Sequence, residues 1–100
     1  NGHIGYNEPG SERQSSCRVV SLASTTIERD SLSIGSMGIT LGVGDILNSK
    51  KIILLATGDS KAFAVRQALK STPSVENPAS FLVNHECISI ILDNQAASML

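Results

Sequence analysis

The sequence predicts an α/β fold that forms part of a doubly wound, mainly parallel sheet with flanking helices. Residues 51–56 and 87–92 are mainly apolar runs without regular polar alternation, as is typical of strands buried on both faces of a parallel sheet. Between them, Ala62, Val65 and Leu69 recur at helical spacing. Strand, helix and strand in this order predict a βαβ unit.

The first half of the chain is predicted to contain shorter elements. Residues 1–16 are rich in Gly, Asn, Ser and Pro and are expected to form a loop. Short strands are expected over 18–22 and 39–41. The polar stretch 25–33 is ambiguous between loop and helix, and a short helix is expected over 45–49.

The second half completes the βαβ pattern. Residues 57–60 are predicted to form a turn, with Asp59 or Ser60 suited to cap the helix that follows. Three further segments are expected to be a proline-containing linker, a short helix and a last helix, over residues 71–78, 79–84 and 94–100. These elements make the expected fold part of a Rossmann-like domain.

Composition limits the classes of function. The chain has 100 residues, of which 41% are hydrophobic and 17% charged, as in globular domains. A net charge of −1, 3% aromatic residues and no Trp argue against a partner that is nucleic acid or an anionic membrane. Cys17 and Cys87 lack metal-ligand spacing and predict reduced thiols in a cytoplasmic protein.

The chain has too few strands for a complete sheet of this kind. It also begins at Asn1 without a Met, directly inside a motif. We therefore interpret residues 1–100 as the carboxyl-terminal part of a single domain whose upstream half is missing.

The stretch NGHIGYNEPG (1–10) carries the most chemical information. It places the imidazole of His3 and the carboxylate of Glu8 five residues apart on a loop with glycines near both ends. A His beside a carboxylate is suited to general acid–base catalysis near neutral pH, and glycines let the backbone approach a ligand closely. Taken alone, the same pair is also compatible with a surface loop that has no catalytic role.

This stretch resembles the signature of the glucosamine-6-phosphate deaminase (isomerase) family, and galactosamine-6-phosphate enzymes carry a very similar segment. The likeness continues in order through GITLGVGDIL (38–47), LLATGDSKA (54–62) and PASFLVNH (78–85). Related 6-phosphogluconolactonases share the Gly-His pair but have a Leu-Phe-Pro-Gly type ending. Glu8 therefore favours the deaminase side.

The resemblance implies an enzyme that converts glucosamine 6-phosphate or galactosamine 6-phosphate into a ketose 6-phosphate and ammonia, without metal or organic cofactor. His3 would be the acid–base group, Glu8 would complete its proton relay, and Asn1 would orient the imidazole. Lys61 would bind the substrate phosphate, and Gly2 would let the backbone approach the substrate. His85, just before a strand, is interpreted as a structural cap or a surface group.

One segment departs from the family pattern. The stretch between Thr26 and Gly38 is shorter than in the common glucosamine enzymes, which carry a phosphate-binding Arg there. Leu32 occupies the nearest ungapped position, and Arg29 is the only local arginine. The shortened form resembles the galactosamine-phosphate branch, so the hexosamine epimer stays open.

Two further functions are compatible with the scaffold. A non-catalytic sugar-phosphate-sensing domain can share it, and so can a lactonase-like hydrolase. The sequence is also compatible with a homo-oligomer.

Overall fold

The structure is a computed structural model that describes residues 2–100. The predicted catalytic residue Asn1 lies outside the described residues. The strands and helices, in chain order, are β1 (Arg18–Ser21), α1 (Ser24–Arg29), β2 (Met37–Thr40), α2 (Val43–Leu47), β3 (Ile52–Ala56), α3 (Ala62–Lys70) and β4 (Ile88–Leu92), with 3₁₀ helices η1 (Asp59–Lys61) and η2 (Pro78–Asn84) before and after α3.

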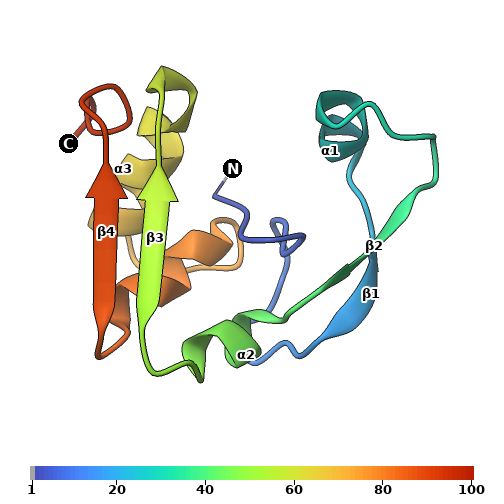
Figure 1. The fold of residues 1–100 in the computed structure, drawn as a ribbon, viewed down its shortest axis with the longest axis horizontal. Coiled ribbons are helices and arrows are strands. Elements are labelled where there is room, and N and C mark those ends of the chain that lie inside the picture. Colours follow the sequence, from blue (N-terminus) through green and yellow to red (C-terminus); the bar gives the residue numbers. More distant parts are fainter. Residues whose placement is uncertain (1) are drawn as a thin grey trace.

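The predicted βαβ unit is confirmed. Strands β3 and β4 pair in parallel, with Ile52 opposite Ile88 and Ala56 opposite Leu92, and they stand side by side in Figure 1. Helix α3 packs against η2. Buried Val65 and Leu82 belong to these two helices, and Ile52 to β3. The α/β class therefore follows from one crossover whose helices cover one face of a two-stranded sheet.

Strands β1 and β2 form a separate antiparallel ribbon, with Arg18 opposite Thr40 and Ser21 opposite Met37. This ribbon and α1 stand apart from β3 and β4 in Figure 1. The sequence predicts a mainly parallel sheet, whereas within residues 2–100 one pair is parallel and the other antiparallel. The connection between β1 and β2 contains the six-residue helix α1, and it returns the chain antiparallel to β1.

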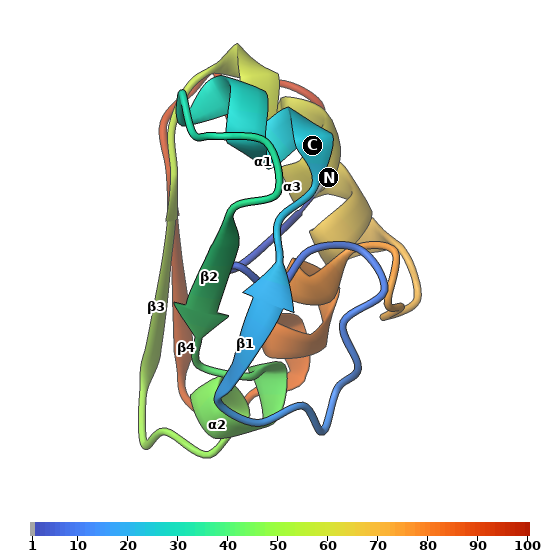
Figure 2. The same cartoon turned by 90° about the vertical axis from the view of Figure 1, so that its right-hand side faces the viewer.

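The prediction that both apolar strands are buried on two faces is wrong for the described residues. Ile53, Leu55 and Ile91 are 62%, 66% and 52% exposed, and exposure alternates along β3 and β4. Figure 2 shows β3 and β4 nearly edge-on, with the helices on one side. Apolar side chains on both faces suit a strand covered by two layers, and residues 2–100 supply one of them.

The carboxyl-terminal segment also differs from its prediction. Residues 93–100 form successive turns in place of the expected last helix. The Asp93 carboxylate accepts N–H groups from Ala96 at 2.7 Å and from Gly58 at 3.0 Å. Neither Asp59 nor Ser60 caps the helix after β3. Instead, Asp93 ties the turn that follows β3 to the end of β4.

No helix within residues 2–100 is long and apolar enough to cross a bilayer.

His85 is a structural cap, which is one of the two roles that the sequence predicts for it. Its Nδ1 accepts the backbone N–H of Cys87 at 3.0 Å, and its Nε2 lies 2.8 Å from the Ser49 carbonyl. These contacts join the loops that precede β3 and β4, with Nε2 donating to the carbonyl.

Replacing His85 by Leu should lower the free energy of unfolding by about 1–3 kcal/mol, because two hydrogen bonds are lost. Urea unfolding followed by circular dichroism measures this change. Glu86→Gln, at the exposed neighbouring position, is the control and should stay within about 0.5 kcal/mol of the parent. An unchanged urea midpoint in His85→Leu would show that the two His85 hydrogen bonds contribute nothing to stability.

Candidate functional site

The amino-terminal loop (residues 2–10) is shaped by one tight turn. Ile4 and Asn7 exchange backbone hydrogen bonds of 3.2 and 3.0 Å. Gly5, inside the turn, has φ +56° and lies against Thr40, so a side chain here would meet both strain and a close contact. The turn places His3 immediately before its first hydrogen-bonded residue.

Asn7 anchors this turn to the antiparallel ribbon. Its side chain is 0% exposed. Its Nδ2 donates to the carbonyls of Ile4 at 3.0 Å and Leu41 at 2.7 Å. Its Oδ1 accepts from Arg18 Nη1 at 2.9 Å. The buried amide therefore has both donors and its acceptor satisfied, which fixes the loop against β1 and the end of β2.

The hydrogen-bond partners of His3 define its tautomer. Nδ1 lies 3.1 Å from the Gly5 carbonyl, which can only accept. Nε2 lies 2.7 Å from Arg29 Nη1, which can only donate. These contacts assign a neutral imidazole with its proton on Nδ1 and a lone pair on Nε2. Nε2 is therefore the nitrogen able to take a proton from a substrate.

A cavity of about 340 Å³ adjoins His3. It lies beside the carboxyl end of β3, where α/β folds usually bind their ligands. Three of the predicted site residues, Gly2, His3 and Lys61, line it together. Its remaining lining is mostly apolar and comes from β3, α3 and the start of η2, through Leu54, Leu55, Ala56, Ala64, Val65, Ala68 and Ala79 among others.

Lys61 enters this cavity from the end of η1, between β3 and α3. It is exposed, so its ammonium stays hydrated while it faces the cavity. Gly58, with φ +88°, turns the chain sharply after β3, and the Asp93 carboxylate holds that turn. The position of Lys61 therefore depends on a contact from the end of β4.

Glu8 does not pair directly with His3. Its Oε2 accepts the backbone N–H of Ala23 at 2.9 Å, and its Oε1 accepts the hydroxyl of Thr26. These groups belong to the start of α1, where free N–H groups attract a carboxylate. In this conformation Glu8 therefore anchors α1, and its predicted part in the relay of His3 stays a prediction.

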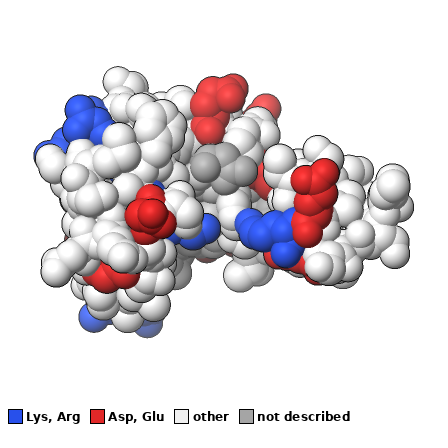
Figure 3. Space-filling view, turned by 90° about the horizontal axis from the view of Figure 1, so that it is seen from above, with Lys and Arg blue, Asp and Glu red and all other residues white. Residues whose placement is uncertain are grey.

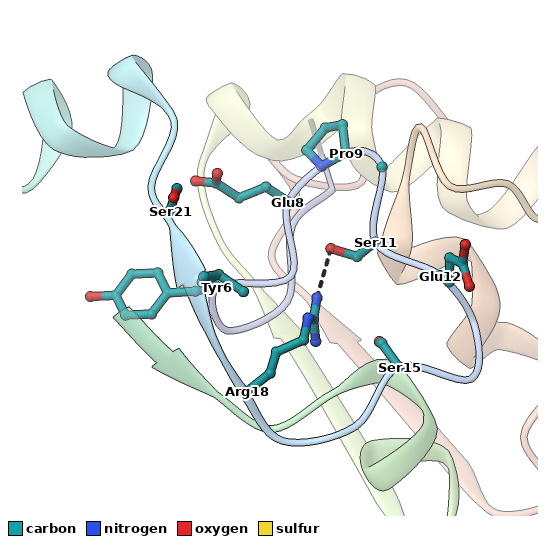
Figure 4. A pocket seen from close by; sticks show the side chains of 10 residues that line it. Tyr6, Glu8, Pro9, Ser11, Glu12, Ser15, Arg18 and Ser21 are labelled. Carbon is teal, nitrogen blue, oxygen red and sulfur yellow. Dashed lines mark hydrogen bonds between the residues drawn. The ribbon is translucent and has the colours of Figure 1, made fainter. Parts of the chain in front are cut away.

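Glu8 instead lines a second cavity, of about 430 Å³, between the amino-terminal loop and β1. Figure 4 shows Glu8 directed toward Ser21 and Arg18 directed toward Ser11. Arg18 Nη2 donates to Ser11 Oγ at 3.3 Å, and Nη1 also lies 3.2 Å from the Ser16 carbonyl. With its further bond to Asn7, Arg18 fastens the loop to β1.

Arg29 is a contact of His3 that the motif analysis did not identify. Its guanidinium also pairs with Asp30, at 2.8 Å for Nε–Oδ1. The pKa of Arg29 is raised mainly by its hydrogen bond to Asp30, and the charge of Glu8 acts in the same direction. The Arg29 hydrogen bond in turn lowers the pKa of Asp30. Because both groups are exposed, this electrostatic coupling orients Arg29 more than it stabilises the fold.

Charges elsewhere form no single-sign surface in the view of Figure 3, where acidic and basic side chains are interspersed. Within residues 2–100, no group of three or more His, Cys, Asp and Glu side chains gathers as a metal site would require.

Comparison with known proteins gives close relatives. No family model matches the sequence. The glucosamine-6-phosphate deaminase of Streptococcus thermophilus is 45% identical over 106 residues, covering 100% of this chain and 46% of the relative. The glucosamine-6-phosphate deaminase of Rhodopirellula baltica is 41% identical, covering 100% of this chain and 42% of the relative. The chain thus spans slightly less than half the length of the relatives it matches.

Two solved structures resemble the fold. A monomeric glucosamine-6-phosphate deaminase of the NagB superfamily aligns with a TM-score of 0.92 and 40% identity, over 100% of this chain and 44% of that one. A 6-phosphogluconolactonase from Trypanosoma cruzi aligns with a TM-score of 0.75 and 27% identity, over 99% and 37%. The resemblance to the deaminase family and the Rossmann-like fold class are confirmed, with this chain forming part of a larger fold.

Replacing Asn7 by Asp should lower the free energy of unfolding by about 2–4 kcal/mol at pH 7. The buried carboxylate would have no N–H to donate, so its oxygen would face the Ile4 and Leu41 carbonyls that Nδ2 now satisfies. The loss should shrink as the pH falls toward 4, because the protonated carboxyl can donate to one carbonyl again. Chemical unfolding at both pH values measures the effect.

The matched control is Asn94→Asp, the same change at an exposed position, which should stay within about 0.5 kcal/mol of the parent. Equal stability of the two variants at pH 7 would contradict the role assigned to Asn7.

Proposed function

We propose that this chain supplies the ring-opening and phosphate-binding parts of an amino-sugar 6-phosphate isomerase/deaminase. The observation that carries the proposal is the single cavity at the carboxyl end of β3 that both His3 and Lys61 line. An acid–base group and a cation on one cavity suit a substrate with a sugar ring and a phosphate. The names of the relatives support the same reaction.

His3 opens the pyranose ring in this proposal. Nε2 takes the proton of the anomeric hydroxyl and returns it to the ring oxygen as the bond between C1 and that oxygen breaks, which gives the open-chain aldehyde. Arg29 now occupies Nε2, so the substrate hydroxyl replaces this guanidinium contact. The Nδ1–H bond to Gly5 persists and keeps the ring in its reactive tautomer.

Lys61 binds the phosphate. As a point charge at the start of α3, it can neutralise a phosphate without fixing one hydrogen-bond geometry, and the first turn of α3 adds backbone N–H groups. Gly2 lets the main chain approach the sugar. Asn1 is proposed to orient His3 through a hydrogen bond, which an amide can make without adding charge.

Glu8 completes the relay indirectly in this conformation. It anchors the first turn of α1. The last residue of this helix, Arg29, contacts His3. A direct exchange between Glu8 and His3 would require α1 to release the carboxylate.

The remaining chemistry belongs to the rest of the protein. A carboxylate outside residues 1–100 moves the C2 proton of the aldehyde, after which the imine is hydrated and ammonia leaves. We propose that the chain is the carboxyl-terminal part of this single domain and that the protein is cytoplasmic. Support for the compartment comes from Cys17 and Cys87, which are exposed free thiols.

Ammonia release by the full-length protein tests the reaction, with glucosamine 6-phosphate and galactosamine 6-phosphate as substrates. His3→Gln should lower kcat by about 10²- to 10⁴-fold, because the acid–base group is lost, while substrate still binds. Lys61→Met should chiefly raise KM.

His85→Gln is the control variant and should keep the parental kcat, because His85 lies outside the cavity. Unchanged turnover in His3→Gln would refute the mechanism. Binding of a phosphosugar without ammonia release would indicate a sensing domain, and acid release from 6-phosphogluconolactone would indicate a lactonase.

A further inference from the structure

The two walls of the His3 cavity come from different parts of the chain. His3 belongs to the amino-terminal loop, whereas Lys61 and Ala64 belong to η1 and α3. Their relative placement needs a connection that spans both walls. Asn77, in the loop before η2, makes contacts with each of them.

On the helical side, Asn77 Nδ2 donates to the Ala64 carbonyl at 3.0 Å. This bond assigns the orientation of the amide, because a carbonyl can only accept and the nitrogen must therefore face it. Ala64 lies three residues after Lys61 on the same helical segment. Asn77 therefore grips the helix one turn beyond the cation.

On the loop side, Asn77 Oδ1 faces Gly2. A Cβ built on Gly2 would overlap Oδ1 and lie 2.9 Å from Nδ2, so the amide fills the space that a side chain at position 2 would need. Gly2 also has φ +65°. Its carbonyl accepts the N–H of Ala79, two residues after Asn77, at 2.9 Å. The segment 77–79 therefore holds the residue that precedes His3 from two directions.

The contact leaves one polar atom unsatisfied. Asn77 Oδ1 is buried and has no hydrogen-bond partner among the described residues. A buried acceptor without a donor is unfavourable, and an unbranched apolar packing residue would avoid that cost. The amide is explained by its other end, where the donor to Ala64 fixes its position while the acceptor end packs against Gly2.

We propose that Asn77 is a positioning residue that sets the placement of His3 relative to Lys61. It braces Gly2 on one side and α3 on the other, so that a phosphosugar anchored at Lys61 presents its anomeric hydroxyl to His3 Nε2. As far as turnover is concerned, this inference rests on the proposed function. The placement of His3 by Asn77 does not depend on whether the protein is catalytic.

The test uses the full-length protein with Asn77→Asp and Asn77→Leu. Both variants keep the approximate size of the side chain and lose the donor to Ala64, one by adding charge and the other by removing polarity. Both should lower kcat about 10- to 100-fold, as expected for a small misplacement of a catalytic group. KM should stay within about threefold, because both variants retain the Lys61 side chain that binds the phosphate. The His3 ring-nitrogen NMR shifts should move away from the parental Nδ1–H tautomer.

His85→Gln is the matched control for a purely structural loss. It weakens the His85 hydrogen bonds to Ser49 and Cys87, which lie outside the cavity. It should therefore lower the melting temperature while kcat and the His3 shifts stay parental. The brace is refuted by parental kcat and parental His3 shifts in both Asn77 variants, and equally by losses that only follow the folded fraction. If the parent protein releases no ammonia, the proposed function fails, and the His3 shifts still decide the brace.

A double-mutant cycle tests the contact directly. In the parent protein, where the Asn77 amide fills the space, Gly2→Ala should strongly reduce kcat and shift the His3 resonances. In an Asn77→Ala background, where that space is free, both effects of Gly2→Ala should be at least about threefold smaller. Backbone strain at position 2 is common to both backgrounds and cancels. Equal effects in the two backgrounds would show that the residues do not touch in solution.

Discussion

The arrangement of the site depends on the fully buried amide of Asn7. The antiparallel ribbon has two strands, and a two-stranded ribbon is marginally stable without further packing. Asn7 compensates by hydrogen bonding to the turn at Ile4, to the end of β2 at Leu41 and to Arg18 in β1. An amide has the donors and the acceptor that these three partners need, whereas a carboxylate or an apolar side chain lacks one kind or both. His3 takes its position from this network.

Helix α1 connects the two halves of the predicted proton relay. Glu8 accepts hydrogen bonds from its first turn, and Arg29 at its end contacts His3. Both ends of a six-residue helix are therefore tied to the same loop. A helix of this length has little stability of its own, so these polar contacts, together with the Arg29–Asp30 pair, determine where it lies. Glu8 and His3 thus contact opposite ends of the same helix, α1.

The sheet shows why this chain is part of a larger fold. Strands β3 and β4 carry large apolar side chains on both faces, and α3 and η2 cover one of them. Parallel sheets are normally covered on both faces. The chain also spans 42–46% of the relatives' length. The exposed apolar face and the partial coverage agree, since a sheet built for two layers has one of them within residues 2–100.

The sequence by itself determined the βαβ unit and the loop that carries His3, and it offered a structural cap as one of two roles for His85. These features follow from local patterns: apolar runs, helical spacing, glycines and a polar residue before a strand. Grouping Gly2, His3 and Lys61 also followed from the sequence, through the family resemblance. The tertiary structure alone decided that Glu8 anchors α1, that Arg29 contacts His3, that Asp93 holds the turn before Lys61, and that Asn77 spans the two cavity walls. The physical reason is that such contacts join side chains far apart in the chain, and local periodicity carries no information about which distant donor and acceptor will meet.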